Sequence, residues 1–379
     1  MIERKNYLKS LQETFEVHPV CAVLGPRQCG KTTLAKIYAQ SFDDVHFFDL
    51  ENPQDLALLD SPSLTLPNLK GLIIIDEIQL KPNLFPYLRF LVDNAADKKF
   101  LILGSASQDL IQQSSETLAG RIGYIELPPF QLWEVGDMQT HWTRGGFPKS
   151  FLASSDLHSE RWRVDYIRTF LERDLAKMGI DISPIHMRRL WSMLAHYHGQ
   201  ILNTSELGRS LDMTQRSIKR YIDILEGCFM IRQLRPWFEN ISKRQIKSPK
   251  LYICDSGIFH SLLGIPSHDI HFHPKCGASW EGYALETIVH STENELAEYY
   301  FWKTEKGAEL DLLVLKNGER LGYEFKYSEH PKTTKSMHSA LEDLKLDRFT
   351  VITPGQRSYP LTDKIFVQSL TDFSQNLSS

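Results

Sequence analysis

The sequence predicts an α/β protein with a parallel sheet near its N-terminus, a helical middle and a smaller α/β unit near its C-terminus. Three observations support this fold class. Short apolar runs alternate with helical patterns as far as Leu127, a helix-turn-helix pattern begins near Thr204, and an α-β-β-β-α-β order begins at Ser279. Strands that alternate with helices are typical of βαβ units, whose parallel sheet is covered on both faces.

The composition is that of a globular chain, with 379 residues, 42% hydrophobic and 24% charged. This length predicts roughly two to three domains. No apolar run has the length of a membrane-spanning helix, and the polar start Met1–Lys5 is unlike a signal peptide. The five cysteines are scattered and form no Cys-x-x-Cys pair, which argues against a disulfide framework or a zinc ribbon. We therefore expect a cytoplasmic protein with no membrane partner.

The N-terminal sheet is predicted from short apolar runs bounded by Asn, Pro, Asp or Ser. Strands are expected at Val20–Leu24, Val45–Asp49, Gly71–Asp76 and Lys99–Gly104. One helix is expected to begin near Lys31 and another to cover Asn83–Ala96, where leucines recur at helical spacing.

The rest of the chain is divided by Pro128-Pro129, which ends this alternation, and by the Pro- and His-rich stretch 265–277. Helices are expected at Arg161–Lys177, Ile185–His198, Ser205–Leu211, Gln215–Glu226, Ser279–Leu296 and Thr334–Leu344. Strands are expected at Phe229–Leu234, Lys250–Cys254, Tyr299–Lys303, Leu310–Lys316, Leu321–Tyr327 and Phe349–Thr353. Two helices followed by a β-hairpin are the order of a winged helix.

A phosphate loop is predicted between the first strand and the helix that follows it. The run Gly25–Thr32 matches G-x-x-x-x-G-K-[ST] at every fixed position. Its glycines permit backbone N–H groups to face phosphate oxygens, while Lys31 is expected to reach the β- and γ-phosphates and Thr32 to hold Mg²⁺. The predicted ATP site is therefore the whole loop, namely Gly25, Pro26, Arg27, Gln28, Cys29, Gly30, Lys31, Thr32 and Thr33.

The strand Gly71–Asp76 ends in two carboxylates that complete this site. Asp76 fits the acid that holds Mg²⁺, and Glu77 fits the base that activates the attacking water. Ser105 is a candidate sensor of the γ-phosphate, or else only a helix cap. Arg121 is a candidate cation for the transition state, in a neighbouring subunit for example, or else a surface ion pair.

The helix-turn-helix region is basic, whereas the chain as a whole carries a charge of −4. Ten basic and four acidic residues lie between Arg209 and Lys250, a local charge of +6. The predicted DNA contacts are Arg216, Lys219 and Arg220 on one face of the second helix, and Lys243, Arg244 and Lys247 in the wing. The alternative is a solvated helix face in a unit that contacts only proteins.

A second site is predicted from the dipeptide Asn317-Gly318, which favours a type I′ hairpin turn. That register places Asp311 opposite Glu324 and Glu309 opposite Lys326, all on one face. Two facing carboxylates repel unless a cation lies between them, and Mg²⁺ or Mn²⁺ would suit oxygen ligands. The alternative is a set of solvated ion pairs, with Glu309–Lys326 as one of them.

These motifs resemble those of AAA-type ATPases, in particular a prokaryotic branch with a C-terminal winged helix and a restriction-endonuclease-like domain. The matching stretches are Gly25–Thr33, Leu72–Gln79, Gly104–Ser107, Leu118–Arg121, Gly145–Pro148 and Leu251–Gly257. The set Asp311, Glu324 and Lys326 resembles the PD-(D/E)xK nuclease core, and Glu281 matches an extra acid of some branches. The chain departs from the family pattern in having Ser105 where many AAA proteins have Asn, and in having no proline before Asp311. The resemblance implies ATP hydrolysis in a homo-oligomer.

The motifs and breaks together predict five segments. They are an ATPase domain at 1–129, a helical segment at 130–200, a winged helix at 201–264, a linker at 265–278 and a nuclease-like domain at 279–379. The linker holds His268, His271, His273 and Cys276, whose spacing matches no common zinc module.

The predicted function is hydrolysis of ATP with Mg²⁺, coupled to the binding or processing of DNA. Lys31, Glu77 and Arg121 are the candidate catalytic residues for ATP. In a metal-dependent endonuclease the catalytic residues would be Asp311, Glu324 and Lys326, with Glu281, Asp311 and Glu324 as metal ligands. The alternative is an ATP-dependent binding or scaffold switch whose nuclease-like domain is inactive.

Overall fold

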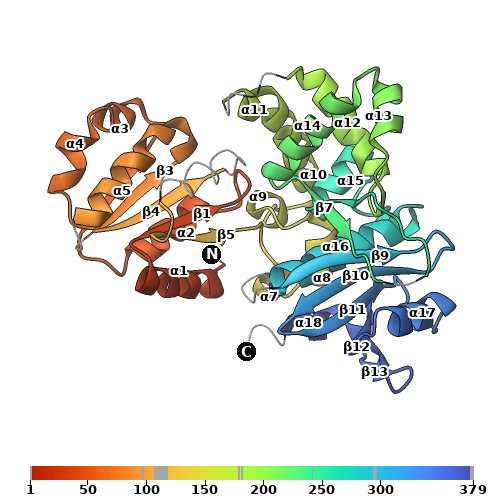
Figure 1. The fold of residues 1–379 in the computed structure, drawn as a ribbon. Coiled ribbons are helices and arrows are strands. Elements are labelled where there is room, and N and C mark those ends of the chain that lie inside the picture. Colours follow the sequence, from red (N-terminus) through yellow and green to blue (C-terminus); the bar gives the residue numbers. More distant parts are fainter. Residues whose placement is uncertain are drawn as a thin grey trace. The chain divides into compact units, whose positions relative to one another are not determined.

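The chain folds into two compact units. The computed structural model describes residues 2–94, 98–105, 118–177, 180, 182–240, 242–292 and 297–375. Residues 1–129, 170–182 and 223–229 form the first unit, and residues 130–169, 183–222 and 230–379 form the second (Figure 1). Within the described part of the chain, no helix has the length and apolar character needed to cross a membrane.

The first unit is built on a five-stranded parallel sheet with the order β2-β3-β4-β1-β5. Its strands are β1 (Val20–Leu24), β2 (Val45–Asp49), β3 (Gly71–Asp76), β4 (Lys98–Gly104) and β5 (Ile122–Glu126). The first three have the predicted bounds, β4 begins one residue earlier than predicted, and β5 was not predicted. Because β4 lies between β1 and β3, the ends of all three strands meet at one edge of the sheet.

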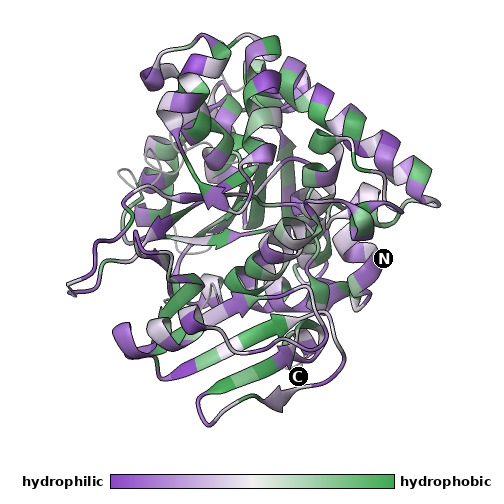
Figure 2. Cartoon of the chain, turned by 90° about the vertical axis from the view of Figure 1, so that its right-hand side faces the viewer, coloured by the Kyte–Doolittle hydropathy of each residue, from purple (hydrophilic) through white to green (hydrophobic). Residues whose placement is uncertain are grey.

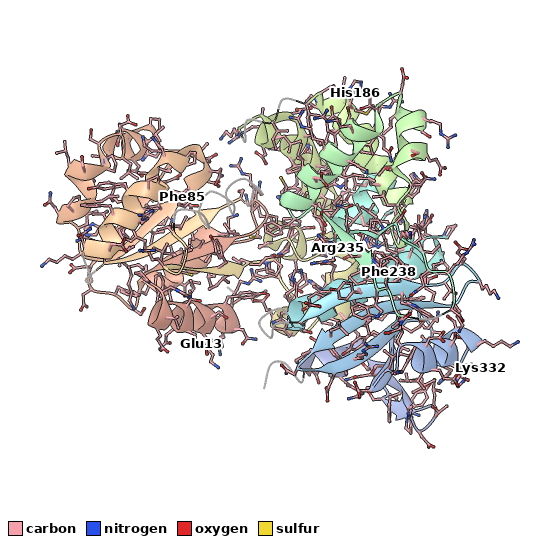
Figure 3. The ribbon with its side chains drawn as sticks, viewed as in Figure 1. Glu13, Phe85, His186, Arg235, Phe238 and Lys332 are labelled. Atoms are coloured by element: carbon pink, nitrogen blue, oxygen red, sulfur yellow. The ribbon has the colours of Figure 1, made fainter. Side chains whose placement is uncertain are left out.

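Alternating residues of these strands point to opposite faces, and helices cover each face (Figure 1). Leu101 and Leu103 of β4 pack with α1 (Lys5–Val17) and α2 (Lys31–Ala39). Phe100 and Ile102 pack with α5 (Phe85–Asn94), whose first residue Phe85 is labelled in Figure 3. The shorter helices of this unit are α3 (Pro53–Leu58), α4 (Pro62–Thr65), a π-helical turn at Phe170–Asp174 and α11 (Leu175–Lys177).

The second unit begins with helices and a small antiparallel sheet. Its helices here are α7 (Leu132–Val135), α8 (Met138–Arg144), α9 (Pro148–Phe151), α10 (Asp156–Thr169), α12 (Pro184–His196), α13 (Thr204–Leu211) and α15 (Ser256–Leu263), together with α14 (Gln215–Gly227) as far as Ile222. The rest of α14 belongs to the first unit. The strands are β6 (Gln200–Ile201), β7 (Ile231–Pro236) and β8 (Lys250–Ile253), with β8 paired antiparallel to both others. The predicted helix Arg161–Lys177 is therefore not one regular α-helix, since α10 ends at Thr169 and a π-helical turn follows.

The same unit ends with the predicted α-β-β-β-α-β order and three further elements. These are α16 (Cys276–Thr292), β9 (Glu298–Lys303), β10 (Glu309–Lys316), β11 (Glu319–Phe325), α17 (Lys335–Asp343), β12 (Arg348–Thr353), β13 (Tyr359–Pro360), β14 (Ile365–Ser369) and α18 (Leu370–Gln375). Pairing of β7 with β9 joins both groups of strands into one nine-stranded sheet. The surface helices of the unit carry hydrophilic and hydrophobic residues on different sides (Figure 2).

One hydrophobic core crosses the stretch that was predicted to be a linker. Ile265, Ile270 and Cys276 are buried in the same cluster as Trp280. The helix α16 begins at Cys276 rather than at Ser279, within that stretch. The segment 265–278 is therefore a packed part of the second unit, because its apolar side chains fill the space beside α16.

The predicted hairpin is confirmed in register and in turn geometry. Leu312 pairs with Tyr323 and Lys316 with Glu319, as the predicted register requires. Asn317 and Gly318 have φ angles of 51° and 83°, both in the left-handed region that a type I′ turn uses.

Candidate functional site

The phosphate loop connects β1 to α2 and closes tightly against the end of β5. A Cβ atom at Gly25 would lie 2.2 Å from the Leu127 carbonyl oxygen, so only glycine fits there. Gly30 precedes α2, has a φ of 108° and has nothing within 4 Å of the position where a Cβ would be. This geometry fits a bound phosphate, since backbone N–H groups at the start of α2 face the same space.

The side chains around this loop supply the cation and the oxygen ligands that a magnesium nucleotide needs. The Lys31 ammonium is buried and donates to the carbonyls of Gly25 and Pro26, at 2.9 Å each. The Thr32 hydroxyl donates to an Asp76 carboxylate oxygen at 2.6 Å. Burial raises the pKa of Asp76 above its ordinary value, and the Thr32 hydrogen bond opposes that rise.

The second predicted carboxylate, Glu77, lies beside the residue at the end of β4. Its backbone has a φ of 55°, and its carboxylate accepts hydrogen bonds from Gln79 and, at 3.5 Å, from the Ser105 hydroxyl. The structure thus brings Ser105 to Glu77, and its role as a sensor stays a prediction. The segment that follows Ser105, including the predicted Ser107 match, lies outside the described residues.

Arg27 of the loop does not face open solvent but forms two ion pairs. Its guanidinium lies 2.5 Å from Asp174 and 2.9 Å from Glu51, and Lys177 also pairs with Glu51 at 2.5 Å. Burial opposes the charge of Arg27, but these carboxylates and Glu77 raise its pKa above the ordinary value. Asp174 and Lys177 belong to the first unit although they are distant in sequence, so the sequence contained no signal for this network.

The other loop residues have simpler environments. Cys29 is fully buried, and its carbonyl accepts a hydrogen bond from Arg4 at 3.4 Å. Gln28 has a φ of 62°, and Thr33 is exposed.

Arg121 forms a surface ion pair, which was one of its two predicted roles. Its Nε lies 2.5 Å from one Asp93 carboxylate oxygen and its Nη2 lies 3.1 Å from the other. This exposed ion pair holds the Arg121 guanidinium at Asp93 of α5.

The predicted DNA-binding residues differ in their surroundings. Arg216, Lys219 and Arg220 are exposed on α14, opposite the buried Ile218 and Ile222. In the loop that was predicted to be a wing, Lys243 pairs with Asp343 at 2.5 Å and Arg244 lies 4.0 Å from Glu305, whereas Lys247 is exposed. Two of the three cations in this loop, Lys243 and Arg244, thus lie beside acids of their own unit. The basic residues of α14 are therefore the better candidates for contact with DNA.

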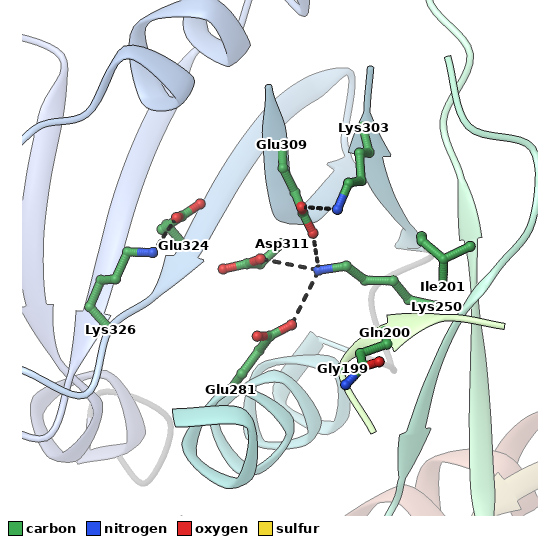
Figure 4. A pocket seen from close by; sticks show the side chains of 10 residues that line it. All are labelled: Gly199, Gln200, Ile201, Lys250, Glu281, Lys303, Glu309, Asp311, Glu324 and Lys326. Carbon is green, nitrogen blue, oxygen red and sulfur yellow. Dashed lines mark hydrogen bonds and ion pairs between the residues drawn. The ribbon is translucent and has the colours of Figure 1, made fainter. Parts of the chain in front are cut away.

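The second predicted site is a polar pocket of about 520 Å³ in the second unit (Figure 4). We call it the carboxylate pocket; its lining residues are Gly199, Gln200, Ile201, Lys250, Glu281, Lys303, Glu309, Asp311, Glu324 and Lys326. The structure therefore brings together all four predicted acids and Lys326. It adds Lys250 and Lys303, which the sequence did not assign to this site.

Lys250 occupies the centre of this pocket. Its ammonium lies 2.5 Å from Glu309 and 3.2 Å from both Glu281 and Asp311. Burial opposes the charge of Lys250, but the surrounding acids outweigh it and hold its pKa well above the ordinary value. The pair Glu309–Lys326 did not form, because Glu309 is held by Lys250 and Lys303.

Glu324 and Lys326 form a separate pair at the other side of the pocket (Figure 4). The Lys326 ammonium lies 2.6 Å from one Glu324 oxygen, and the other oxygen has no hydrogen-bond partner among the described residues. Burial and the nearby Asp311 charge raise the pKa of Glu324 to about 8.

The predicted metal set Glu281, Asp311 and Glu324 is not arranged as metal ligands. Within the described ranges, no three acidic, histidine or cysteine side chains are placed to share one metal ion. The physical reason is that two lysines divide the set: Lys250 holds Glu281 and Asp311, and Lys326 holds Glu324 at the other side of the pocket (Figure 4). In the stretch 268–276, His271 instead hydrogen bonds to Tyr327 and Gln139, at 2.8 Å each.

The chain matches three protein-family models. Residues 17–136 match the "AAA domain" model, residues 135–269 a "Domain of unknown function (DUF8612)" and residues 276–373 a "Domain of unknown function (DUF4143)". The first match covers the phosphate loop, the parallel sheet, and Asp76 and Glu77 at and just after the end of β3.

The chain is also similar to whole proteins. It is 47% identical over 370 residues to the uncharacterized proteins Rv2008c of Mycobacterium tuberculosis and Mb2031c of Mycobacterium bovis, covering 96% of this chain and 83% of each relative. It is 22% identical over 300 residues to an uncharacterized protein of Haemophilus influenzae, covering 70% of this chain and 74% of that one.

Two solved structures show a limited similarity to this chain at low sequence identity. The Walker-type ATPase PABY2304 of Pyrococcus abyssi is 13% identical, with 69% of this chain and 96% of that chain covered and a TM-score of 0.49. The RuvB Holliday junction branch migration motor of Thermotoga maritima is 19% identical, with 61% and 90% covered and a TM-score of 0.29. On the sequence match to the mycobacterial proteins, together with the loop geometry and the domain match, the chain belongs to the family of Rv2008c and Mb2031c and carries an AAA-type P-loop ATPase domain.

Proposed function

We propose that this protein binds and hydrolyses ATP with Mg²⁺ at the phosphate loop and uses the nucleotide state to control DNA binding by its second unit. The observation that carries the proposal is the Thr32–Asp76 hydrogen bond of 2.6 Å beside the loop lysine, with Glu77 next in sequence. A hydroxyl and a carboxylate are the oxygen ligands that Mg²⁺ takes in P-loop enzymes.

Each residue of this site has a distinct part in hydrolysis. Lys31 would exchange its two loop carbonyls for phosphate oxygens, and Thr32 and Asp76 would hold Mg²⁺. Bound Mg²⁺ would supply positive charge to the phosphate oxygens. Glu77 accepts the proton of the attacking water, and the Ser105 hydroxyl positions its carboxylate.

Assembly into a homo-oligomer remains part of the proposal and is implied by the family resemblance. In such an assembly Arg121 would have to leave Asp93 before it could reach a nucleotide in a neighbouring copy.

Replacing Lys31 with alanine is expected to weaken ATP binding about tenfold or more, since a charge-assisted hydrogen-bond donor to phosphate is lost. The measurement is titration of the full chain with a fluorescent ATP analogue in Mg²⁺. Lys36→Ala, an exposed lysine on the same helix, is the matched control and should bind as the wild type does. Equal ATP affinity of Lys31→Ala and wild type would contradict the proposal that ATP binds at the phosphate loop.

For the DNA partner, the supporting observation is the exposed basic face of α14. Arg216, Lys219 and Arg220 carry positive charge on the side of the helix opposite its buried apolar residues. Phosphate contacts of this kind depend on salt, because binding releases counterions from the DNA. We place the contact on α14 rather than on Lys243 and Arg244, which face Asp343 and Glu305.

Reversing two charges on α14, Lys219→Glu with Arg220→Glu, is expected to weaken duplex DNA binding about tenfold or more. The slope of log K against log salt should fall by about two, one for each lost phosphate contact. Fluorescence anisotropy with and without ATP measures both values. The control pair Lys332→Glu with Lys335→Glu reverses two exposed charges elsewhere in the unit and should leave affinity within about threefold. Unchanged affinity and slope in the α14 variant would contradict the DNA proposal.

A metal-dependent endonuclease, with Asp311, Glu324 and Lys326 in catalytic roles, is the second candidate for the C-terminal part. We favour the alternative, a binding or scaffold function for this part, because Lys250 lies among the carboxylates that would hold the metal. Cleavage of supercoiled DNA with Mn²⁺ or Mg²⁺ by the wild type, lost in Glu324→Ala, would reverse this preference.

A further inference from the structure

The carboxylate pocket already contains a cation of its own. The Lys250 side chain is only 3% exposed, and its ammonium lies within 3.2 Å of Glu281, Glu309 and Asp311 (Figure 4). Lys250 begins β8, whereas the acids come from α16 and β10, so the lysine enters the pocket from a different part of the sheet.

Three of the carboxylate oxygen atoms that a divalent cation would need, Glu281 Oε1 and both oxygens of Asp311, already accept hydrogen bonds from donors of the chain. Glu281 Oε1 also accepts a hydrogen bond from the Tyr252 hydroxyl at 2.6 Å. The second Asp311 oxygen accepts the backbone N–H of Phe325 at 3.1 Å. These donors belong to the chain itself, so Glu281 Oε1 and both Asp311 oxygens are satisfied without a bound ion, whereas the second Glu324 oxygen has no partner among the described residues.

The charges of the pocket point the same way. Its four carboxylates, on Glu281, Glu309, Asp311 and Glu324, face three ammonium groups, on Lys250, Lys303 and Lys326. A divalent cation added to this set would meet the buried Lys250 charge at close range, and like charges at such distances repel strongly in a desolvated site. The same cation would be attracted if Lys250 carried no charge.

We propose that Lys250 is a built-in replacement for a divalent cation in the carboxylate pocket, and that loss of its charge converts the pocket into a metal-binding site. The lysine holds Glu281, Glu309 and Asp311 together in the way that an ion would, and so fixes α16 and β10 against β8. This inference deepens the binding-module part of the proposed function and rests on it, but it does not involve the phosphate loop.

The test measures Mn²⁺ binding by the nucleotide-free full chain. The two methods are calorimetry and the paramagnetic resonance signal of free Mn²⁺. The proteins are wild type, Asp311→Asn, Lys250→Met and Lys250→Met with Asp311→Asn. Methionine keeps much of the length of lysine but removes the charge, and the Asp311 change removes one pocket carboxylate. Comparing each protein with its Asp311→Asn partner separates pocket binding from any Mn²⁺ held at Thr32 and Asp76.

The wild type and Asp311→Asn are expected to bind the same number of Mn²⁺ ions. Lys250→Met should bind one more, and the double variant should lose it. Mn²⁺ should also raise the melting temperature of Lys250→Met and leave that of the wild type unchanged, because only the variant has a site in the pocket. Neither the number of bound Mn²⁺ ions nor the melting temperature depends on ATP turnover or DNA binding. The test can therefore be interpreted even if either of those proposed functions is absent.

Two results would overturn the proposal. One is a wild-type Mn²⁺ site that disappears in Asp311→Asn, and the other is a folded Lys250→Met protein that gains no Mn²⁺. The first result requires no Lys250 variant. If Lys250→Met does not fold in the absence of metal, Lys250→Gln, whose amide can still donate to a carboxylate, takes its place in the same comparison.

Discussion

Replacing Glu77 with glutamine is expected to reduce ATP turnover about a hundredfold or more, because a general base contributes roughly that factor. ATP affinity should change by less than about threefold, since Lys31, Thr32 and Asp76 keep their contacts. Glutamine has nearly the shape of glutamate and can accept the Ser105 hydrogen bond, so the change removes mainly the ability to take up a proton. The measurement is phosphate release at saturating ATP, beside a binding titration.

The matched control for Glu77→Gln is Glu13→Gln, the same chemical change at an exposed position of α1 (Figure 3). It should turn over ATP at the wild-type rate. Wild-type turnover by Glu77→Gln would show that another group activates the water. A joint loss of turnover and affinity would instead mean that Glu77 supports the nucleotide site as a whole.

Much of the ATPase domain could be predicted because its elements depend on local pattern. The strands β1 and β3 were predicted at their observed bounds, since strands buried on both faces are continuous apolar runs. The edge strand β2 was also predicted at its bounds, although it is only partly buried. The strand β5 was missed because its exposed Tyr124 and its glycine break such a run. Helix α1 was also missed, although Tyr7, Leu11 and Phe15 recur at helical spacing on its buried side.

The carboxylate pocket could be predicted only in part, for a different reason. The hairpin that carries Asp311 and Glu324 depends on a two-residue turn, which is a local signal. Lys250 reaches the same pocket only because β7 pairs with β9, a contact between distant parts of the chain. In the sequence, Lys250 could only be counted among the ten basic residues between Arg209 and Lys250. A lysine at the start of the apolar run Lys250–Ile253 was a hint of burial, but nothing local named its partners.

The ion pairs of Arg27 and Lys243 also could not be predicted from the local sequence. Arg27 could be placed in the loop from sequence, but its partner Asp174 belongs to a turn that joins the first unit from far along the chain. Lys243 was predicted to contact DNA because its partner Asp343 is near it in space but 100 residues away in the sequence. Charge can be counted from a sequence, whereas the pairing of charges depends on tertiary structure.

The buried Glu286 is expected to stabilise the second unit strongly, and Glu286→Ala should lower its free energy of unfolding by about 3–5 kcal/mol. Its carboxylate is held by both arms of the Arg232 guanidinium, at 2.7 and 3.0 Å, and lies 3.3 Å from His290. Alanine leaves the largely buried Arg232 charge without its bidentate carboxylate, and it detaches β7 from α16. Glu305→Ala, at an exposed pair with Arg244, is the control and should cost at most about 1 kcal/mol.

Tryptophan fluorescence makes this measurement specific to the second unit. All seven tryptophans of the chain lie in that unit, so their signal during urea unfolding does not report on the ATPase sheet. Equal midpoints and slopes for wild type and Glu286→Ala would contradict the expected loss. A changed slope would instead indicate that the compactness of one state has changed.

The pH dependence of the same variant tests whether charge is the cause. Burial alone would raise the pKa of Glu286, but the Arg232 charge and the His290 hydrogen bond outweigh it and lower the pKa from 4.5 to about 2. A carboxyl whose pKa is lowered by folding stabilises the protein above its unfolded pKa, and that stability disappears as the pH falls towards the folded value. The stability difference between wild type and Glu286→Ala should therefore be constant above about pH 5 and shrink between pH 4.5 and 2. A difference that did not shrink in this range would point to lost packing around α16 rather than to the lost ion pair.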